Sequence, residues 1–403
     1  MEHDYRHLST KFDMDAWLDA TDDLAPGNHS ANDVPASRPF VHMTGPGGDI
    51  LLRQWPAGTP ATKPEAYARV LNALHAAAGD VIPAVSAHPK DADSVTTQVK
   101  EHLYSAQTWL TGRPLGRFGG YETPDGDPIT LPLPESAHAD EVIVQVAAAL
   151  AKAHEASADL DRKGIPVYTI AMMMDRVRKY WFEQRKVLGE NAAEERDIRR
   201  WLRCGNRVVP TSSDLIRNST NSLHDSSVVL HNDLWPENIL IEGHDVSRSL
   251  TGIVGWRHMS AGSPVLDIAQ LTVNMQGWSA ALTEAIVESY SSNRHLRPDE
   301  RRLVPAVAGL LLVETVGKML TLNYLDQRMI GHEATSVLRS GMKTMLDSLE
   351  RVTHILAPDI QQTERFARQR KSDSAGYAPK FSGKRPSGGR PQNENRPRRK
   401  PKS

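Results

Sequence analysis

The stretch from residue 228 to residue 271 constrains the fold of this 403-residue chain more than any other part of the sequence. Residues 228–230 and 239–241 are short apolar runs of the kind that form buried β-strands, and a third run covers residues 250–256. Pro236 prevents a helix from forming between the first two runs, because its ring fixes φ and its nitrogen has no hydrogen to donate. The sequence therefore predicts a loop between short strands.

This loop carries a carboxylate and a carboxamide at a fixed spacing. Asp233 follows the first strand, and Asn238 stands five residues later, just before the second strand. We expect the two side chains to face the same cavity. His231 precedes Asp233 by two residues, which completes the spaced pattern H-x-D-x-x-x-x-N of kinase catalytic loops.

The loop sequence HNDLWPENIL resembles the catalytic loop of the aminoglycoside phosphotransferase and choline kinase family, which usually has the form HGDLHPGNVL. Downstream, Gly262-Ser263-Pro264 and Asp267 resemble the GDPxxDLA segment of the same family. The resemblance implies an α+β fold with two lobes, as in protein kinases. The N-lobe would be small and β-rich, and the C-lobe larger and mainly helical.

The resemblance also implies ATP-dependent transfer of the γ-phosphate to a hydroxyl group of a small molecule. Asp233 would accept the proton of that hydroxyl, while His231 would orient the loop and Asp267 would brace it from behind. Asn238 would hold a magnesium ion through its amide oxygen. Arg53 would bind the α- and β-phosphates where the family usually has a lysine; its charge is permanent and its planar fork can bind a phosphate at two points.

One position departs from the family pattern. The strand before Trp256 normally ends in Ile-Asp-Trp or Ile-Asp-Phe, and that Asp binds magnesium, whereas this chain has Gly255. Magnesium prefers hard oxygen ligands, of which carboxylates are the most common. A replacement would have to come from nearby acids, each of which suits a surface position better than a metal site: Glu237, Glu242 and Asp245.

The loss of this carboxylate leaves three functions open. The chain is an active small-molecule kinase with an unusual metal site, or a pseudokinase that binds a nucleotide or metabolite without transferring phosphate. In the third interpretation, the kinase-like body is a scaffold and a basic C-terminal tail binds nucleic acid or another acidic partner. The acceptor is not specified; acids on large-lobe helices that would suit a cationic acceptor are Glu284, Glu314 and Asp326.

Three regions follow from the resemblance and the composition. We expect the small lobe over residues 1–108, the helical lobe over 109–358 with the catalytic loop at 231–238, and a disordered basic tail over 359–403. From residue 361 onward the chain has thirteen Lys/Arg and three Asp/Glu, a net charge of about +10, whereas the rest carries about −11. Such a tail suits nucleic acid, with an affinity that falls steeply with salt.

The predicted small lobe contains a hairpin, a helix and a hinge. Residues 38–43 and 50–55 should pair around a Gly/Pro-rich turn, and residues 64–78 have the apolar spacing of a helix. Glu65 is the nearest acid to pair with Arg53, but in the first turn it suits the helix dipole better. The backbone of residues 106–108 would bind adenine, by its position in the resemblance.

The predicted large lobe is helical. The expected helices cover residues 137–156, 170–188, 192–204, 212–221, 266–275, 280–291, 298–324 and 335–356.

The remaining features indicate a cytoplasmic protein. No run of 18 uninterrupted apolar residues predicts a membrane span, and the polar N-terminus lacks the pattern of a secretory signal. Cys204 is the single cysteine, so no intramolecular disulfide can form. His154, a lone histidine on a predicted helix, suits a packing role better than a ligand role.

Overall fold

The computed structural model describes most of the chain between residues 40 and 357. The described ranges are 40–45, 48–56, 58–87, 94–99, 102–116, 140–191, 194–223, 227–243, 248–275, 277–325 and 332–357. They belong to one compact unit that ends at Pro358. The predicted tail and the first 39 residues of the predicted small lobe lie outside the described residues, and the lobe boundary at residue 108 stays a prediction.

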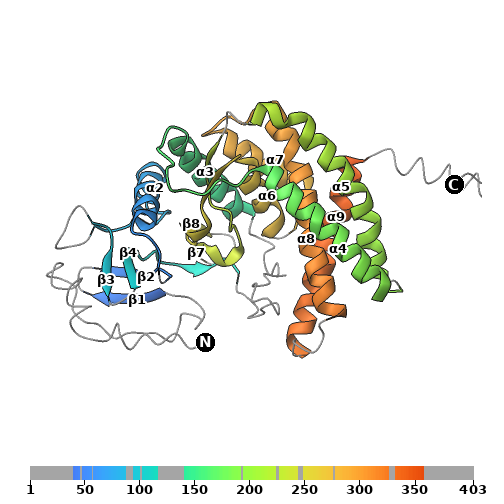
Figure 1. Ribbon diagram of the computed structural model, residues 1–403, viewed down its shortest axis with the longest axis horizontal. Helices are drawn as coiled ribbons and strands as arrows, with labels where there is room; N and C mark the ends of the chain where they lie inside the picture. Colours follow the sequence, from blue (N-terminus) through green and yellow to red (C-terminus); the bar gives the residue numbers. More distant parts are fainter. Residues whose placement is uncertain are drawn as a thin grey trace, which may run out of the picture. The chain divides into compact units, whose positions relative to one another are not determined.

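The N-terminal part is built on a four-stranded antiparallel sheet in the order β1-β2-β4-β3 (Figure 1). Its strands are β1 (Phe40–Gly45), β2 (Gly48–Gln54), β3 (Thr97–Val99) and β4 (His102–Thr108). β1 and β2 pair from Phe40↔Arg53 to Gly45↔Gly48, which confirms the predicted hairpin.

Helix α2 (Thr62–Ala78) belongs to the same part of the chain and confirms the predicted helix. It buries Val70, Leu71 and Leu74, and the ring of Tyr67 meets that of Trp55 edge-on, with centroids 5.5 Å apart. The next helix along the chain, α3 (Asp140–Ser157), packs against α2 and so links the sheet to the helical part.

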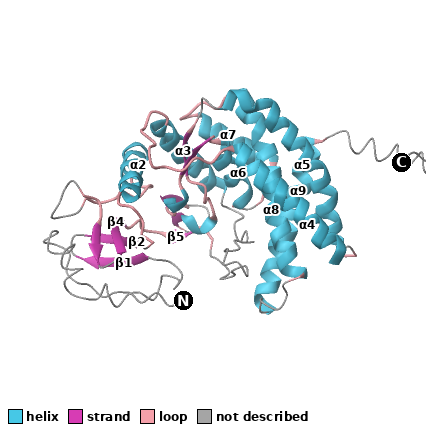
Figure 2. Ribbon diagram, viewed as in Figure 1, coloured by secondary structure: helices cyan, strands magenta, loops and turns pink. Residues whose placement is uncertain are grey.

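The C-terminal part is mainly helical (Figure 2). After α3 the helices are α4 (Ile170–Asn191), α5 (Arg196–Leu223), α6 (Val265–Asn274), α7 (Ala280–Ser291), α8 (Pro298–Tyr324) and α9 (His332–Leu356). α8 packs against α4, α5, α6 and α9. Among the described helices it alone is long and apolar enough to span a membrane, but 78% of that window is buried inside the protein, as expected of a core helix.

The prediction of two helices over residues 192–204 and 212–221 is wrong, because one helix, α5, runs through both. Pro210 lies inside it, where a proline removes one helical hydrogen bond and usually bends or breaks the helix. Here Val208 and Val209 are buried, and α5 packs along α8 and α9. Tertiary packing on both sides of the proline therefore outweighs its local cost.

Two small sheets frame the predicted loop. One has the order β5-β7-β8, from β5 (Arg113–Pro114), β7 (Ile239–Glu242) and β8 (Ser249–Ile253). The other pairs β6 (Val228–Leu230) with β9 (Ser260–Gly262). The third predicted strand ends early, at Ile253, because Gly255 has a left-handed backbone and residues 256–258 form the short 3-10 helix η5 (Trp256–His258).

The contact between α4 and α5 depends on a glycine. A Cβ added at Gly205 would overlap the indole ring of Trp181, which is 2% exposed. We expect Gly205→Ala to lower the free energy of unfolding by about 1–3 kcal/mol, because the packed ring cannot yield without moving its neighbours. Chemical denaturation measures this change.

Gly189 on α4 is the matched control, because a Cβ there meets nothing within 4 Å. Gly189→Ala should leave stability unchanged or raise it by about 0.5–1 kcal/mol, through the helix propensity of alanine. Equal stability of the two variants would show that the ring of Trp181 adapts freely.

Candidate active site

The loop between β6 and β7 is held by one buried carboxylate. Asp267, on α6, accepts hydrogen bonds from the backbone N–H groups of His231 (2.7 Å, to Oδ2) and Asn232 (2.9 Å, to Oδ1). Asn232 has a φ of +62°, a left-handed conformation that asparagine adopts more readily than most residues. The carboxylate therefore fixes a backbone turn that would otherwise be unfavourable.

Asp267 has a second set of partners deeper in the protein. The Nε2 atom of His154 lies 3.2 Å from Oδ2, and the Nδ1 atom of His154 lies 2.8 Å from the hydroxyl oxygen of Tyr290. Burial acts to raise the pKa of Asp267, but the hydrogen bond from His154 and the two nearby histidines outweigh it and hold that pKa below its usual value. His154 is thus a buried, hydrogen-bonded packing residue.

Two further residues on the same face of α6 bind the loop. The N–H of Leu234 donates to Oε1 of Gln270 (3.2 Å), and Nδ2 of Asn274 donates to the carbonyl of Leu234 (2.9 Å). With Asp267 they stand at positions i, i+3 and i+7, which share one helix face. α6 therefore holds the loop from His231 to Leu234.

The structure brings Asp233 and Asn238 together, as the sequence predicts. Nδ2 of Asn238 donates to the backbone carbonyl of Asp233 (2.7 Å) and lies 3.1 Å from its Oδ2. Asn238 is buried, whereas the side chain of Asp233 keeps 18% of its surface exposed. Asn238 thus fixes the backbone of Asp233, and the carboxylate remains accessible to a bound molecule.

His231 connects the loop to the strand that leads to Gly255. Its Nε2 lies 2.8 Å from the carbonyl of Val254, and its Nδ1 accepts from the N–H of Asp233 (3.1 Å). Because a carbonyl can only accept, Nε2 carries the hydrogen and the ring is neutral in this arrangement. Burial lowers the pKa of His231, which favours the same neutral form.

The amide of Asn238 fills the space beside Gly255. Gly255 has φ +86° and ψ 21°, and a Cβ there would lie 2.7 Å from both Cγ and Oδ1 of the Asn238 amide. The glycine thus lets the amide approach closer than any side chain at residue 255 would permit. The amide oxygen of Asn238 faces the position where the family has its principal metal ligand.

These residues do not fit the magnesium site that the resemblance implies. They offer one amide oxygen at Asn238 and no partner carboxylate at Gly255. Glu242 is exposed and accepts a hydrogen bond from Thr111, and Asp245 lies outside the described residues. Within the described ranges, no group of three or more His, Cys, Asp or Glu side chains is placed to hold a metal ion.

A cationic side chain approaches Asp233 instead. Nη2 of Arg257 lies 4.0 Å from Oδ2 of Asp233, and its Nε donates to Nε2 of His258 (2.8 Å). Burial lowers the pKa of His258, so its ring tends to stay neutral and accept that hydrogen bond. The sequence reasoning missed both residues; the available signal was a pair of basic residues that begins two positions after Gly255.

Arg53 is held by aromatic rings. Its guanidinium carbon lies 3.9 Å from the ring centroid of Trp55 and 4.7 Å from that of Tyr67. Burial lowers the pKa of Arg53, and the charge of Arg257 acts in the same direction. The partner of Arg53 on α2 is Tyr67, while Glu65 is exposed, as its place in the first turn predicts.

The predicted adenine contact at residues 106–108 is wrong for two backbone groups. The N–H of Thr108 donates to the carbonyl of Ala84, and the carbonyl of Ala106 accepts from the N–H of Ser86, both at 2.9 Å. Both groups are used to pair β4 with residues 84–86. The prediction failed because this pairing joins segments that the sequence pattern does not connect.

The acids expected near an acceptor have different environments. Glu314 on α8 is buried and lies 2.8 Å from Nη2 of Arg176 and 3.5 Å from Nζ of Lys318. Glu284 on α7 is exposed, and Asp326 lies outside the described residues. The charge of Glu314 is therefore neutralised within the protein.

A small antiparallel sheet, a helical part and a loop that presents Asp233 and Asn238 define a protein-kinase-like phosphotransferase fold. The chain belongs to the phosphotransferase enzyme family, whose model matches residues 33–304. No curated protein is significantly similar to the chain in sequence.

Three solved structures illustrate what the chain is similar to. An aminoglycoside phosphotransferase from Alicyclobacillus acidocaldarius has a TM-score of 0.57 at 14% identity, over 84% of this chain and 94% of that one, which shows the shared fold. A spectinomycin phosphotransferase in complex with ADP and spectinomycin gives 0.48 at 12% identity, over 81% and 94%. A choline/ethanolamine kinase family protein from Mesorhizobium loti gives 0.43 at 17% identity, over 81% and 93%.

The lowered pKa of His231 predicts a pH dependence of stability. Below the ordinary histidine pKa of 6.5 the unfolded chain binds a proton that the folded protein does not, so stability falls as the pH decreases. One such proton contributes up to about 1.4 kcal/mol per pH unit. Urea denaturation of wild type and His231→Gln between neutral pH and the mildly acidic range should show a shallower slope in the variant.

His295, which is exposed, provides the control for this measurement. His295→Gln should keep the wild-type slope. Asp267 does not affect this slope in the mildly acidic range. Its pKa is lowered from 3.8, so its contribution to the free energy of unfolding is lost only in stronger acid. The interpretation fails when wild type and His231→Gln have the same slope.

Proposed function

We propose that the protein transfers the γ-phosphate of ATP to a hydroxyl group of a small molecule. The observation that carries this proposal is the accessible carboxylate of Asp233, on a loop braced by Asp267 and faced by Arg257. Family membership supports phosphoryl transfer. The use of ATP and a small-molecule hydroxyl as acceptor rest on the resemblance of the sequence. The proposed cytoplasmic location rests instead on the polar composition of the sequence, in which no membrane span is predicted.

In this proposal Asp233 accepts the proton of the acceptor hydroxyl as its oxygen attacks the γ-phosphorus atom, and ADP leaves. Phosphoryl transfer requires mainly positioning and neutralisation of the phosphate charge. His231 and Asp267 fix the backbone of Asp233, and so act through position. Asn238, predicted as a metal ligand, bonds to Asp233 and stabilises the loop at its other end.

Arg53 and Arg257 are the groups that we propose bind the phosphates. Both are arginines, whose charge is permanent and whose planar fork suits phosphate oxygens. Arg53 is pre-oriented by Trp55 and Tyr67, and Arg257 lies on the loop that follows Gly255. A positive side chain therefore stands near the position where the family has a metal-binding acid, and fixed cations of this kind stabilise transferring phosphates.

Binding of ATP should therefore depend on Arg257 more than on magnesium. At about 100 times the dissociation constant, ATP should raise the free energy of unfolding by roughly 2.7 kcal/mol, in wild type with EDTA as well as with magnesium. Arg257→Gln should lose most of this shift, and the exposed Arg302→Gln should keep it. A thermal-shift titration measures these differences.

Two variants at residue 255 separate the alternatives. Gly255→Asp adds a carboxylate and Gly255→Ala adds only a Cβ, and both displace the Asn238 amide. A shift that needs magnesium in wild type contradicts the metal-independent site. No shift in wild type, with a magnesium-dependent shift in Gly255→Asp alone, indicates a pseudokinase whose metal site has been lost.

Transfer itself is tested by Asp233→Asn. We expect this variant to bind ATP as wild type does but to lose roughly 10²–10⁴-fold in transfer to small alcohols, because the amide cannot accept the proton. Release of ADP in an acceptor screen that includes aminoglycosides, choline and homoserine gives the readout. Equal rates in wild type and Asp233→Asn would remove Asp233 from the mechanism.

A further inference from the structure

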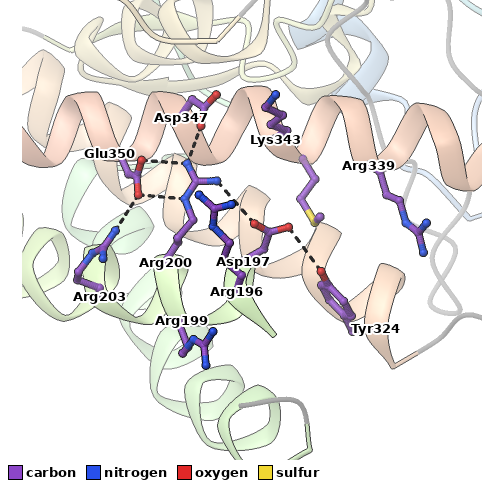
Figure 3. Close-up of a pocket in the computed structure, with 11 residues that line it drawn as sticks. Arg196, Asp197, Arg199, Arg200, Arg203, Tyr324, Arg339, Lys343, Asp347 and Glu350 are labelled. Carbon is purple, nitrogen blue, oxygen red and sulfur yellow. Dashed lines mark hydrogen bonds and ion pairs between the residues drawn. The ribbon is translucent and has the colours of Figure 1, made fainter. Parts of the chain in front are cut away.

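A cavity of about 570 Å³ lies in the helical part, among α5, the end of α8 and α9. Its lining residues are Arg196, Asp197, Arg199, Arg200, Arg203, Tyr324, Arg339, Met342, Lys343, Asp347 and Glu350. None of them belongs to the catalytic loop or to the residues that contact it. Figure 3 shows side chains from α5 on one side of the cavity and from α9 on the other.

The acidic side chains of this cavity are already neutralised. Arg200 reaches Asp347 (2.5 Å) and Glu350 (2.9 Å), and Arg203 also binds Glu350 (2.9 Å). The hydrogen bond from Arg200 is the main reason that the pKa of Glu350 is held below its usual value. Asp197 lies 3.6 Å from Nη1 of Arg200 and 3.5 Å from the hydroxyl oxygen of Tyr324.

The lining of the cavity has a net positive charge. The lining contains five arginines and one lysine but only three acids, so its net charge is +3. The lining acids do not contact four of these cations, namely Arg196, Arg199, Arg339 and Lys343. Arg339 donates to the amide oxygen of Asn323 (3.2 Å), and Arg199 makes an exposed ion pair with Glu194 at 3.9 Å. Within the described part of the chain, Arg196 and Lys343 have no carboxylate within 4.0 Å.

Neither the stability of α5 nor the composition of the chain explains the net positive charge of this cavity. Arg196, Arg199 and Arg200 lie in the first two turns of α5, where the helix dipole disfavours positive charge. The residues before 361 carry a net charge of about −11, so cations gather here against the overall balance. A bound anion would remove the repulsion between the arginines.

We propose that this cavity binds a small organic molecule that carries two or more phosphate groups. Arg196 and Arg339 lie on opposite walls, so each can bind a separate phosphate through its planar fork. Tyr324 and Met342 supply apolar surface for an organic body between the phosphates. The volume falls within the range of ordinary ligand pockets, and the site is separate from the proposed ATP site.

Calorimetric titration of the full chain with inorganic pyrophosphate tests the site. Wild type should bind it saturably, and the double variant Arg339→Gln/Lys343→Gln should bind about tenfold or more weakly, because two charge-assisted hydrogen bonds are lost. Both residues are exposed on α9, so the variant should fold. The double variant Arg302→Gln/Lys179→Gln removes the same charge from exposed positions outside the cavity and should bind as wild type does.

Arg53→Gln distinguishes this cavity from the proposed nucleotide site. This variant should retain pyrophosphate binding and lose the ATP-dependent thermal shift. The cavity variant Arg339→Gln/Lys343→Gln should lose pyrophosphate binding and retain the ATP-dependent thermal shift. The proposal is overturned when wild type gives no saturable binding at millimolar pyrophosphate, or when the cavity variant binds as wild type does. An equal loss in the outside-cavity control, or loss only in Arg53→Gln, would also overturn it.

Discussion

The hydrogen bonds of Asp267 determine the geometry on which the rest of the site depends. A fully buried carboxylate is costly unless its oxygens are satisfied, and here two backbone N–H groups and His154 satisfy them. In return, the carboxylate fixes the left-handed backbone conformation of Asn232. It thereby fixes the direction in which the side chain of Asp233 points away from the loop. Because α6 also binds Leu234, the accessible acid stands on a backbone that is held from one rigid helix. Positions fixed in this way are what phosphoryl transfer requires of a protein.

The same network connects Gly255 to the carboxylate of Asp233. His231 binds the carbonyl of Val254, next to the glycine, and Asn238 fills the space that a side chain at residue 255 would need. Asn238 in turn hydrogen-bonds to Asp233, so the absence of a side chain at residue 255 affects the surroundings of Asp233. Arg257, two residues further on, brings positive charge to within 4.0 Å of Asp233. The segment that begins at Gly255 therefore determines both the amide and the guanidinium that lie beside this carboxylate.

The parts of the site that the sequence predicted are those encoded locally. His231, Asp233 and Asn238 are brought together by one loop between two strands, and Asp267 follows on the helix that packs beneath it. The sequence did not predict the roles of Tyr67, Arg257 and His258. These roles depend on contacts that α2, β2 and η5 make in the folded protein, and the spacing of residues along the chain does not reveal such contacts. The same reason explains why α5 continues through Pro210 and why β4 pairs with residues 84–86: contacts between distant segments outweighed local preferences.

The two groups of cationic side chains are held in different ways. Arg53 lies over the faces of Trp55 and Tyr67, which attract the guanidinium and fix its position. In the helical cavity, Arg200 and Arg203 neutralise the acids of the lining, which leaves Arg196 and Lys343 without a carboxylate partner in the described structure. A carboxylate placed directly on Arg196 or Lys343 would neutralise its charge and reduce its affinity for phosphate. The ion pairs of Arg200 and Arg203 therefore preserve the positive charge that an anion in this cavity would meet.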